Sequence, residues 1–309
     1  MYKLRFGAEY HRIECARDWP KIVQQIERWG YSSVCLPDHF YTHLAAVPAL
    51  AAAAISTSRL RLTSHVLSNS FRHPLLLAKE AATIDFLSDG RLELGIGTGW
   101  HVKEHLETGI ALPEPAERLA RLNEAVQVIR SAFEGRAFSF TGKYITVRDY
   151  VGIPRPARDG GPPILIGGGS RGVLSLAART ADIVGLNFTL RQGVLTEHSI
   201  SSGGLRETRQ KLEWIEREAA REARTPEISV RVNNTIITDD RDKALKNLSK
   251  TTGAPIENLR DSPHVLCGTL AQIKDDIAFR RNELGISYFV ITGDAYRGLR
   301  PIVEALSEI

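Results

Sequence analysis

Short β-rich runs alternate with helical patterns along the whole of this 309-residue chain. Strands separated by helices pair in parallel, because each helix returns the chain to the end of the sheet where the next strand begins. The expected strands are Leu4–Gly7, Ser33–Leu36, Leu60–Ser64, Arg91–Ile96, Ile164–Gly167, Asp182–Leu186, Ile228–Ile237 and Ser287–Thr292. Eight strand–helix repeats favour a closed (β/α)8 TIM barrel in the α/β class, with an open Rossmann-type sheet as the alternative.

The segments between the strands carry the spacing of amphipathic helices. Leu119, Leu122, Val126 and Ile129 recur every three or four residues in the segment that ends at Phe133. The expected helices are Asp18–Trp29, Pro48–Thr57, Pro74–Leu87, Glu117–Phe133, Arg171–Thr180, Leu205–Arg224, Thr269–Leu284 and Leu299–Ser307. We therefore predict a single barrel domain over residues 1–309.

Three loop insertions exceed the repeat, near residues 137–160, 188–204 and 238–267. The first contains Thr141-Gly142 between aromatic residues and is typical of a small hairpin. The second is weakly patterned and could form a mobile lid, and the third is a charged helical excursion. In a barrel, loops that follow strands build the active site, so the last two insertions are candidates for substrate contact.

Charge and cysteine usage exclude several classes of protein. Lys and Arg number 40 against 36 Asp and Glu, and both signs are mixed along the chain, which argues against nucleic-acid binding. Cys15, Cys35 and Cys267 are far apart and have no CxxC spacing, which argues against a disulfide framework or a zinc site and favours a reducing cytoplasm. The longest apolar stretch, 44–55, is too short to span a membrane.

Polar residues at the ends of the second and fourth strands are the first candidates for chemistry. Asp38 and His39 pair a carboxylate with an imidazole, so that His39 could move a proton while Asp38 sets its tautomer. The plain alternative is that Asp38 caps a turn and His39 packs. After the fourth strand, Trp100 could wall a pocket, and Glu104 could reach the substrate or brace the loop.

Glycine and hydroxyl residues follow the third, fourth and fifth strands. Ser64 and Ser68 would let a flat ring approach the backbone, and the glycines around Thr98 would do the same, although both segments could be ordinary turns. The spacing of these glycines is not that of a dinucleotide-binding loop. Gly167–Arg171 precedes a helix, so its exposed amides form an anion site to which phosphate is suited, or simply a flexible loop.

Metal catalysis is a further alternative for a barrel. His101 and His105 are four residues apart, with Glu104 beside His105, so that one helical face could present two imidazoles. The sequence lacks an early His-x-His and a late strand-end Asp that would complete a hydrolase site. We therefore expect no metal site and rank a metal-dependent barrel hydrolase low, together with a barrel that binds a ligand without turnover.

These motifs together resemble the bacterial luciferase-like oxidoreductase superfamily. The resemblance rests on Pro37-Asp38-His39, Arg72-His73-Pro74, Ala78-Lys79, Thr83-Ile84-Asp85, Ser88-Asp89-Gly90-Arg91, Leu94-Gly95-Ile96-Gly97-Thr98-Gly99-Trp100, Gly167-Gly168-Gly169, Ala181-Asp182, Gly268-Thr269 and Leu284-Gly285-Ile286-Ser287-Tyr288. Within the superfamily the chain is most similar to the branch that uses the deazaflavin coenzyme F420, with FMN as the alternative cofactor.

The resemblance implies a ring site above the strands. It places a non-proline cis peptide and a bulge at Ser64, His65 and Val66, with Ser68 beside the ring. It makes Gly97 and Thr98 part of the wall of the ring pocket. It assigns the coenzyme phosphate to Gly167, Gly168, Gly169, Ser170 and Arg171, whereas general barrel experience would place phosphate after the seventh or eighth strand.

The resemblance also implies the chemistry. Asp38 and His39 would lie near the reactive face, and the expected reaction is hydride transfer between F420 and an activated double bond or carbonyl-type group, with His39 assisting the proton. Reduction of the double bond is the expected direction, and a reduced-FMN-dependent monooxygenase is the alternative. The F420-dependent sugar-phosphate dehydrogenases have a catalytic Glu where this chain has Trp100, so that we expect an apolar substrate pocket instead. Relatives are often homodimers.

Overall fold

The computed structural model describes residues 2–10, 15–190 and 193–306. Its centre is a closed ring of parallel strands. These strands are β1 (Arg5–Glu9), β2 (Ser33–Leu36), β3 (Arg61–Ser64), β5 (Leu92–Gly97), β8 (Ile164–Gly168), β9 (Ile183–Leu186), β10 (Glu227–Val232) and β13 (Ile286–Thr292). Each strand pairs with the next in this order, and pairing of β13 with β1 closes the ring. The predicted (β/α)8 barrel is confirmed.

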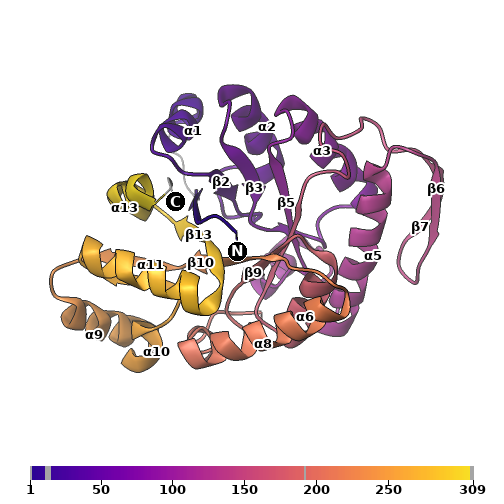
Figure 1. The fold of residues 1–309 in the computed structure, drawn as a ribbon. Coiled ribbons are helices and arrows are strands. Elements are labelled where there is room, and N and C mark those ends of the chain that lie inside the picture. The colour runs from indigo at the N-terminus through magenta and orange to yellow at the C-terminus, as the bar shows by residue number, and fades with distance from the viewer. Residues whose placement is uncertain (1, 11–14, 191–192, 307–309) are drawn as a thin grey trace.

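Helices surround this ring, as Figure 1 shows. The main ones are α1 (Trp19–Arg28), α2 (Ala46–Ser56), α3 (Pro74–Leu87), α5 (Pro115–Phe133), α6 (Arg171–Thr180), α8 (Leu205–Arg221), α11 (Leu270–Leu284) and α13 (Arg300–Leu306). Their order matches the prediction, with small differences at the ends. The sequence marks some ends clearly: α11 begins with a capping box between Thr269 and Gln272 and ends at the left-handed Gly285.

The barrel interior is apolar near its middle and charged near the amino ends of the strands. Buried apolar side chains inside the ring include Leu165, Ile183 and Val290. Below them, the Glu93 carboxylate accepts hydrogen bonds from the guanidinium groups of Arg5, at 2.8 Å, and Arg61, at 2.5 Å. Burial alone would raise the pKa of Glu93, but the two guanidinium groups outweigh it and the pKa is lowered. This end of the barrel is therefore filled with paired charges, and the open end lies opposite.

One segment that was predicted as a single strand forms two strands in the structure. The run 228–237 was expected to form a single strand, but it divides at Asn233 into β10 and β11 (Asn234–Ile237). Only β10 belongs to the barrel, because β11 pairs with β12 (Val265–Gly268) in a separate parallel ribbon. The prediction is wrong here because apolar alternation continues through Asn233, while the change of pairing partner has no local sequence signal.

The predicted insertions take up specific structures. The first contains the hairpin of β6 (Phe138–Thr141) and β7 (Thr146–Tyr150), which projects beside α5 in Figure 1. The third contains α9 (Arg241–Thr252) and α10 (Ile256–Arg260), next to α11. The described residues also include four short helices, namely the 3-10 turn Ala16–Asp18, α4 (Val102–Thr108), α7 (Glu197–Ser201) and α12 (Ala295–Gly298).

A bulge interrupts the barrel after β3. The peptide between His65 and Val66 is cis, and the two-residue strand β4 (Leu67–Ser68) then takes over pairing with β5. Gly95 lies against this bulge so closely that a Cβ there would stand 1.8 Å from the carbonyl oxygen of Ser64. The cis peptide and the bulge lie where the resemblance implies them.

Candidate active site

The floor of the site is a smooth surface around Val66. A Cβ on Gly97 would come within 2.8 Å of the Val66 side chain, and one on Gly167 within 3.3 Å. Val66 therefore fits between two strand ends that carry no side chain, and it packs on the apolar interior of the barrel below. A flat, bare surface at the carboxyl ends of β5 and β8 suits a planar ring.

His39 and Glu104 form a dyad at one side of this floor. The Nδ1 atom of His39 lies 2.9 Å from Oε2 of Glu104, and the Phe40 amide donates to Oε1 at 2.5 Å. Glu104 is buried on α4, and His39 follows β2. No described residue hydrogen-bonds to Nε2 of His39, and that atom is not fully buried. When Nδ1 donates to the carboxylate, Nε2 offers a lone pair to the site.

Asp38 pairs with Arg72 and not with His39, the partner expected from the sequence. Its carboxylate accepts hydrogen bonds from both terminal nitrogens of Arg72, at 2.6 and 3.0 Å, and from the Ser68 amide at 3.0 Å. The expectation that Asp38 sets the tautomer of His39 is wrong, because Glu104 occupies Nδ1 instead. Asp38 fixes the loop after β2 against the bulge, so that it orients His39 through the backbone.

Aromatic side chains enclose the dyad. The Tyr41 ring is stacked on His39, with centroids 4.6 Å apart, and Trp100 meets His39 edge to face at 5.8 Å. His101 lies against Trp100 at 4.8 Å. Trp100, which the sequence suggested as a pocket wall, thus lies against His39, and these rings make the surroundings of the imidazole largely aromatic.

A second His–carboxylate dyad, which we did not predict, lies at the carboxyl ends of β1 and β3. The Glu9 carboxylate at the end of β1 is fully buried, and its Oε2 lies 2.5 Å from Nδ1 of His65. Arg231 at the end of β10 donates to Oε1 of Glu9 at 2.7 and 3.0 Å. Desolvation would lower the pKa of Arg231, but Glu9 outweighs it and raises that pKa.

The two dyads share one neighbour. Burial is the main cause that raises the pKa of the Tyr41 hydroxyl to about 12, and the negative charges of Glu104 and Glu9 raise it further. Arg231 acts in the opposite direction from the two carboxylates. The charges of both dyads act on the Tyr41 hydroxyl. The His65 amide donates at 2.7 Å to the carbonyl of Leu36, three residues before His39, so that both imidazoles belong to segments at the carboxyl end of β2.

The glycine loop after β8 leads into α6. A Cβ on Gly169 would stand 2.2 Å from the carbonyl oxygen of Phe188 and 2.5 Å from that of Asn187, so the loop lies directly on the segment after β9. Ser170 occupies the N-cap position of α6, but its side chain makes no cap hydrogen bond. Arg171 is exposed, with no ion pair to any described residue. These uncommitted donors fit a phosphate group.

A buried lysine supports the same loop from behind. The Nζ atom of Lys211, on α8, donates at 2.8 Å to the carbonyl oxygens of both Asn187 and Ser202. Burial lowers the pKa of Lys211 to about 8. Nearby His264 is buried, and desolvation followed by the Lys211 charge lowers its pKa to about 3. Lys211 therefore ties the two ends of the second insertion to the barrel.

Three further residues that were predicted to bind the coenzyme make contacts between or beside the barrel strands. The Ser64 hydroxyl donates to the Gly95 carbonyl at 2.9 Å and accepts from the Gly95 amide, so that it joins β3 to β5. Thr98 lies at the end of β5, where its hydroxyl donates to the carbonyl of Gly99 at 3.3 Å. Gly168, next to Gly167, pairs with Leu186 of β9.

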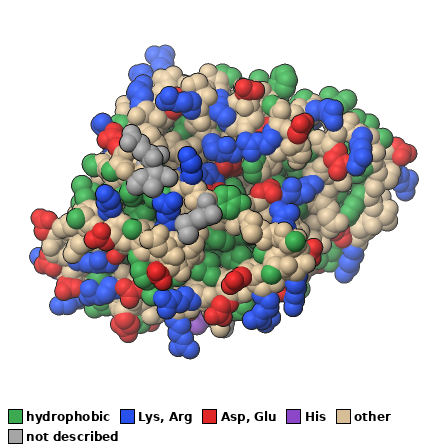
Figure 2. Space-filling view, in the orientation of Figure 1, with side chains coloured by type: hydrophobic (Ala, Val, Ile, Leu, Met, Phe, Trp, Pro, Cys, Tyr) green, Lys and Arg blue, Asp and Glu red, His purple; other side chains and the backbone are tan. Residues whose placement is uncertain are grey.

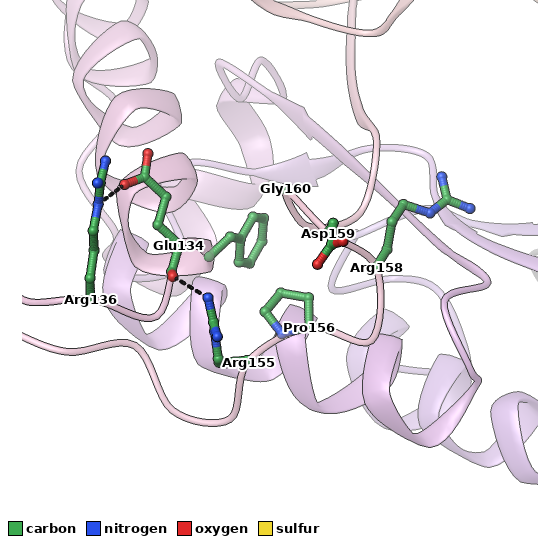
Figure 3. Close-up of a pocket in the computed structure, with 8 residues that line it drawn as sticks. Glu134, Arg136, Arg155, Pro156, Arg158, Asp159 and Gly160 are labelled. Carbon is green, nitrogen blue, oxygen red and sulfur yellow. Dashed lines mark hydrogen bonds and ion pairs between the residues drawn. The ribbon is translucent and has the colours of Figure 1, made fainter.

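Further observations concern a hollow, the surface charge and the described helices. A hollow of about 350 Å³ lies at the carboxyl end of α5, where it is lined by Phe133, Arg155 and Arg158 (Figure 3), and none of its lining residues belongs to either dyad. Basic and acidic side chains are mixed over the face in Figure 2. In the described ranges, no group of three or more His, Cys, Asp or Glu is arranged to hold a metal. None of the helices described has the length and hydropathy needed to cross a bilayer.

The family is decided by a match along most of the chain. The sequence model of the luciferase-like monooxygenases matches residues 3–281, a range that includes both dyads, the bulge and the glycine loop. The chain belongs to the luciferase-like monooxygenase family. Family membership accounts for the barrel and the bulge together.

Curated relatives within the family share part of the chain. An F420-dependent glucose-6-phosphate dehydrogenase of Kineococcus radiotolerans is 36% identical over 166 residues, which cover 51% of this chain and 48% of the relative. A similar enzyme of Beutenbergia cavernae is 34% identical over 188 residues, covering 58% and 55% of the two chains. The chain thus spans about half the length of the curated relatives it matches.

Solved structures agree over the whole fold. The coenzyme F420 dependent tetrahydromethanopterin reductase of Methanopyrus kandleri superposes with a TM-score of 0.76 at 17% identity, covering 99% of this chain and 98% of that one. An F420-dependent secondary alcohol dehydrogenase in complex with an F420-acetone adduct gives 0.76 at 19% identity, covering 98% of both. At such identities the likeness shows the fold alone.

Proposed function

We propose that this chain is an F420-dependent oxidoreductase that interconverts a small secondary alcohol and its carbonyl compound by hydride transfer. The observation that carries the proposal is the His39–Glu104 dyad, whose open Nε2 lies beside a floor suited to a planar ring. The curated relatives named above as F420-dependent dehydrogenases support the choice of coenzyme.

Residues of this chain fit such a coenzyme at two places. Val66, Gly97 and Gly167 form the surface for the ring. The amides at the start of α6, with Ser170 and Arg171, suit its phosphate. When bound, the coenzyme supplies a ring carbon that accepts or gives up hydride.

His39 handles the proton of the alcohol. In oxidation, Nε2 of His39 would accept the hydroxyl hydrogen as a proton, and the carbonyl would form as the substrate carbon gives up its hydride to the bound coenzyme. The imidazolium that results is stabilised by Glu104 at 2.9 Å. In the reverse direction the same Nε2 donates a proton to the carbonyl oxygen. This arrangement favours the alcohol–carbonyl pair over the double-bond reduction expected from the sequence.

The aromatic wall limits the substrates. Tyr41 is stacked on the His39 ring and Trp100 meets it edge to face, so that a substrate near Nε2 contacts aromatic surface. A hydrocarbon or aromatic group beside the alcohol gains from burial there, whereas a phosphorylated sugar does not. Arg231 does not supply a free charge for a phosphate, because Glu9 pairs with it.

The test traces the hydrogen that leaves the reacting carbon of the alcohol. The protein is incubated with F420 and a secondary alcohol that carries deuterium on the reacting carbon, and the reduced coenzyme is analysed by mass spectrometry. The proposal expects one deuterium in the coenzyme and a carbonyl product. A product that contains oxygen from molecular oxygen, formed with reduced FMN and not with F420, would instead show the monooxygenase reaction.

The assembly and the location are parts of the same proposal. We propose a homodimer formed through α2 and α3, because Ile55, Phe86 and Leu87 are 75%, 63% and 48% exposed on these neighbouring helices. A cytoplasmic location agrees with the buried, unpaired thiols of Cys35 and Cys267. Light scattering after size exclusion measures the assembly, and a monomeric mass would exclude the dimer.

A further inference from the structure

The dyad of His65 and Glu9 has no role in the reaction described above. Hydride transfer to or from an alcohol moves one proton, and His39 is placed to carry it. His65 nevertheless has the same arrangement as His39: Nδ1 lies 2.5 Å from a buried carboxylate. No described residue bonds to its Nε2, and that atom is not fully buried. A second imidazole with a free Nε2 therefore lies at the carboxyl end of β2, near the segment that carries His39.

The surroundings of Glu9 show that this orientation is strongly held. Glu9 has no exposed surface, and Arg231 binds it through two nitrogens, so the carboxylate is stabilised as an anion. An anion at that position accepts the Nδ1 hydrogen of His65. The neutral imidazole then presents Nε2 as an acceptor, which requires an O–H or N–H donor.

We infer that Nε2 of His65 binds a second hydroxyl of the substrate, next to the hydroxyl that His39 deprotonates. This inference rests on the proposed function, and it narrows the substrate class. The preferred substrate is an alcohol with a neighbouring hydroxyl and an apolar or aromatic group, since Trp100 and Tyr41 form the wall beside His39. A hydrogen-bonding site that must be filled discriminates strongly against an analogue that lacks the group.

Two related alcohols give a direct comparison. α-Methylbenzyl alcohol and styrene glycol share the aromatic ring and the secondary alcohol, but only the glycol has the neighbouring hydroxyl. Wild-type enzyme with F420 is expected to prefer the glycol in kcat/KM. The His65→Asn variant is expected to lower that preference at least tenfold, mainly through KM for the glycol, since the loss is one of binding. An unchanged preference would overturn the inference.

A matched control separates this effect from general damage. His73→Asn changes another histidine to the same residue at the N-cap of α3, where His73 is exposed and asparagine also caps well. This variant is expected to keep the wild-type preference. If it lost the preference equally, the effect would not belong to His65. Thermal unfolding of both variants checks that they are folded.

Labelling of the wild-type protein decides the matter without a variant or turnover. Diethyl pyrocarbonate modifies accessible imidazole nitrogens, and peptide mass spectrometry reports on His65 separately in the F420-bound enzyme. Styrene glycol is expected to protect His65 more than α-methylbenzyl alcohol does, while both protect His39. Equal labelling of His65 in the two alcohols overturns the inference even if neither is oxidised. Failure of F420 to bind would instead contradict the proposed function.

Discussion

The Oε2 atom of Glu104 lies 2.9 Å from Nδ1 of His39, and the other carboxylate oxygen accepts the amide of Phe40 at 2.5 Å. One buried side chain therefore holds both the imidazole and the backbone that carries it. Because Glu104 is on α4 and His39 follows β2, the contact also fixes the loop after β5 over the site. This relationship gives His39 a defined tautomer and is the basis of the first two predictions.

Replacing His39 by Asn removes the group that moves the proton. We expect kcat to fall by about 10² to 10⁴, the usual contribution of general acid–base catalysis, while the Kd for F420 changes less than about threefold. Steady-state kinetics and fluorescence titration of the coenzyme measure the two quantities. Turnover at the wild-type rate would remove His39 from the mechanism.

Glu104→Gln should act through His39 and not independently of it. We expect kcat to fall by about tenfold, because an amide stabilises the imidazolium less well than a carboxylate. In the double variant with His39→Asn, the loss should be no larger than that of His39→Asn alone. A double-variant cycle of kcat measures this, and additive losses would mean that the two residues work separately.

Gly169→Ala tests the close contact between the glycine loop and the segment after β9. A Cβ at this position would meet two backbone carbonyl oxygens, of Phe188 and Asn187, so the loop must move. We expect F420 binding to weaken at least tenfold, by fluorescence titration. Gly298→Ala is the matched control, because the atom its Cβ meets is the mobile end of Ile237. Equal affinity in both variants would exclude the loop from the coenzyme site.

Lys211 should make stability depend on pH above neutrality. Burial lowers its pKa to about 8 from 10.5, so between these values the unfolded chain binds more protons than the folded one. The free energy of unfolding therefore rises with pH over this window, by about 2 to 3 kcal/mol at most. Lys211→Met should lack this rise, as urea unfolding at pH 7 and about pH 10 would show.

The control for Lys211 is a lysine in water. Lys21 is 77% exposed, so Lys21→Met should follow the wild-type protein at every pH. A rise with pH that persists in Lys211→Met would mean that another group titrates, and the buried ammonium would then have no part in it.

The sequence predicted the barrel because its signals are local. Continuous apolar runs, helical spacing and residues such as Gly285 each identify one element, and their alternation leaves few topologies. It did not predict the division at Asn233, since the choice between two strand partners depends on residues 30 or more positions away. A tertiary pairing overrode a local pattern there.

The candidate site was predictable only in part. His39, Trp100 and Glu104 were chosen because they follow strand ends, and the structure brings them together, but the carboxylate that orients His39 was assigned to its neighbour Asp38. The ion pair of Arg231 with Glu9 links positions 222 residues apart. Glu9 ends β1 and Arg231 is the penultimate residue of β10, so that a charge near the carboxyl end of a strand was the available signal.

The most direct test of the central claim is the choice of coenzyme. Purified protein is titrated in parallel with F420, FMN and NADPH while fluorescence is followed. Our account predicts saturable binding of F420, weakened in Gly169→Ala, with much weaker binding of FMN and none of NADPH. Tight binding of FMN with no binding of F420 would contradict it.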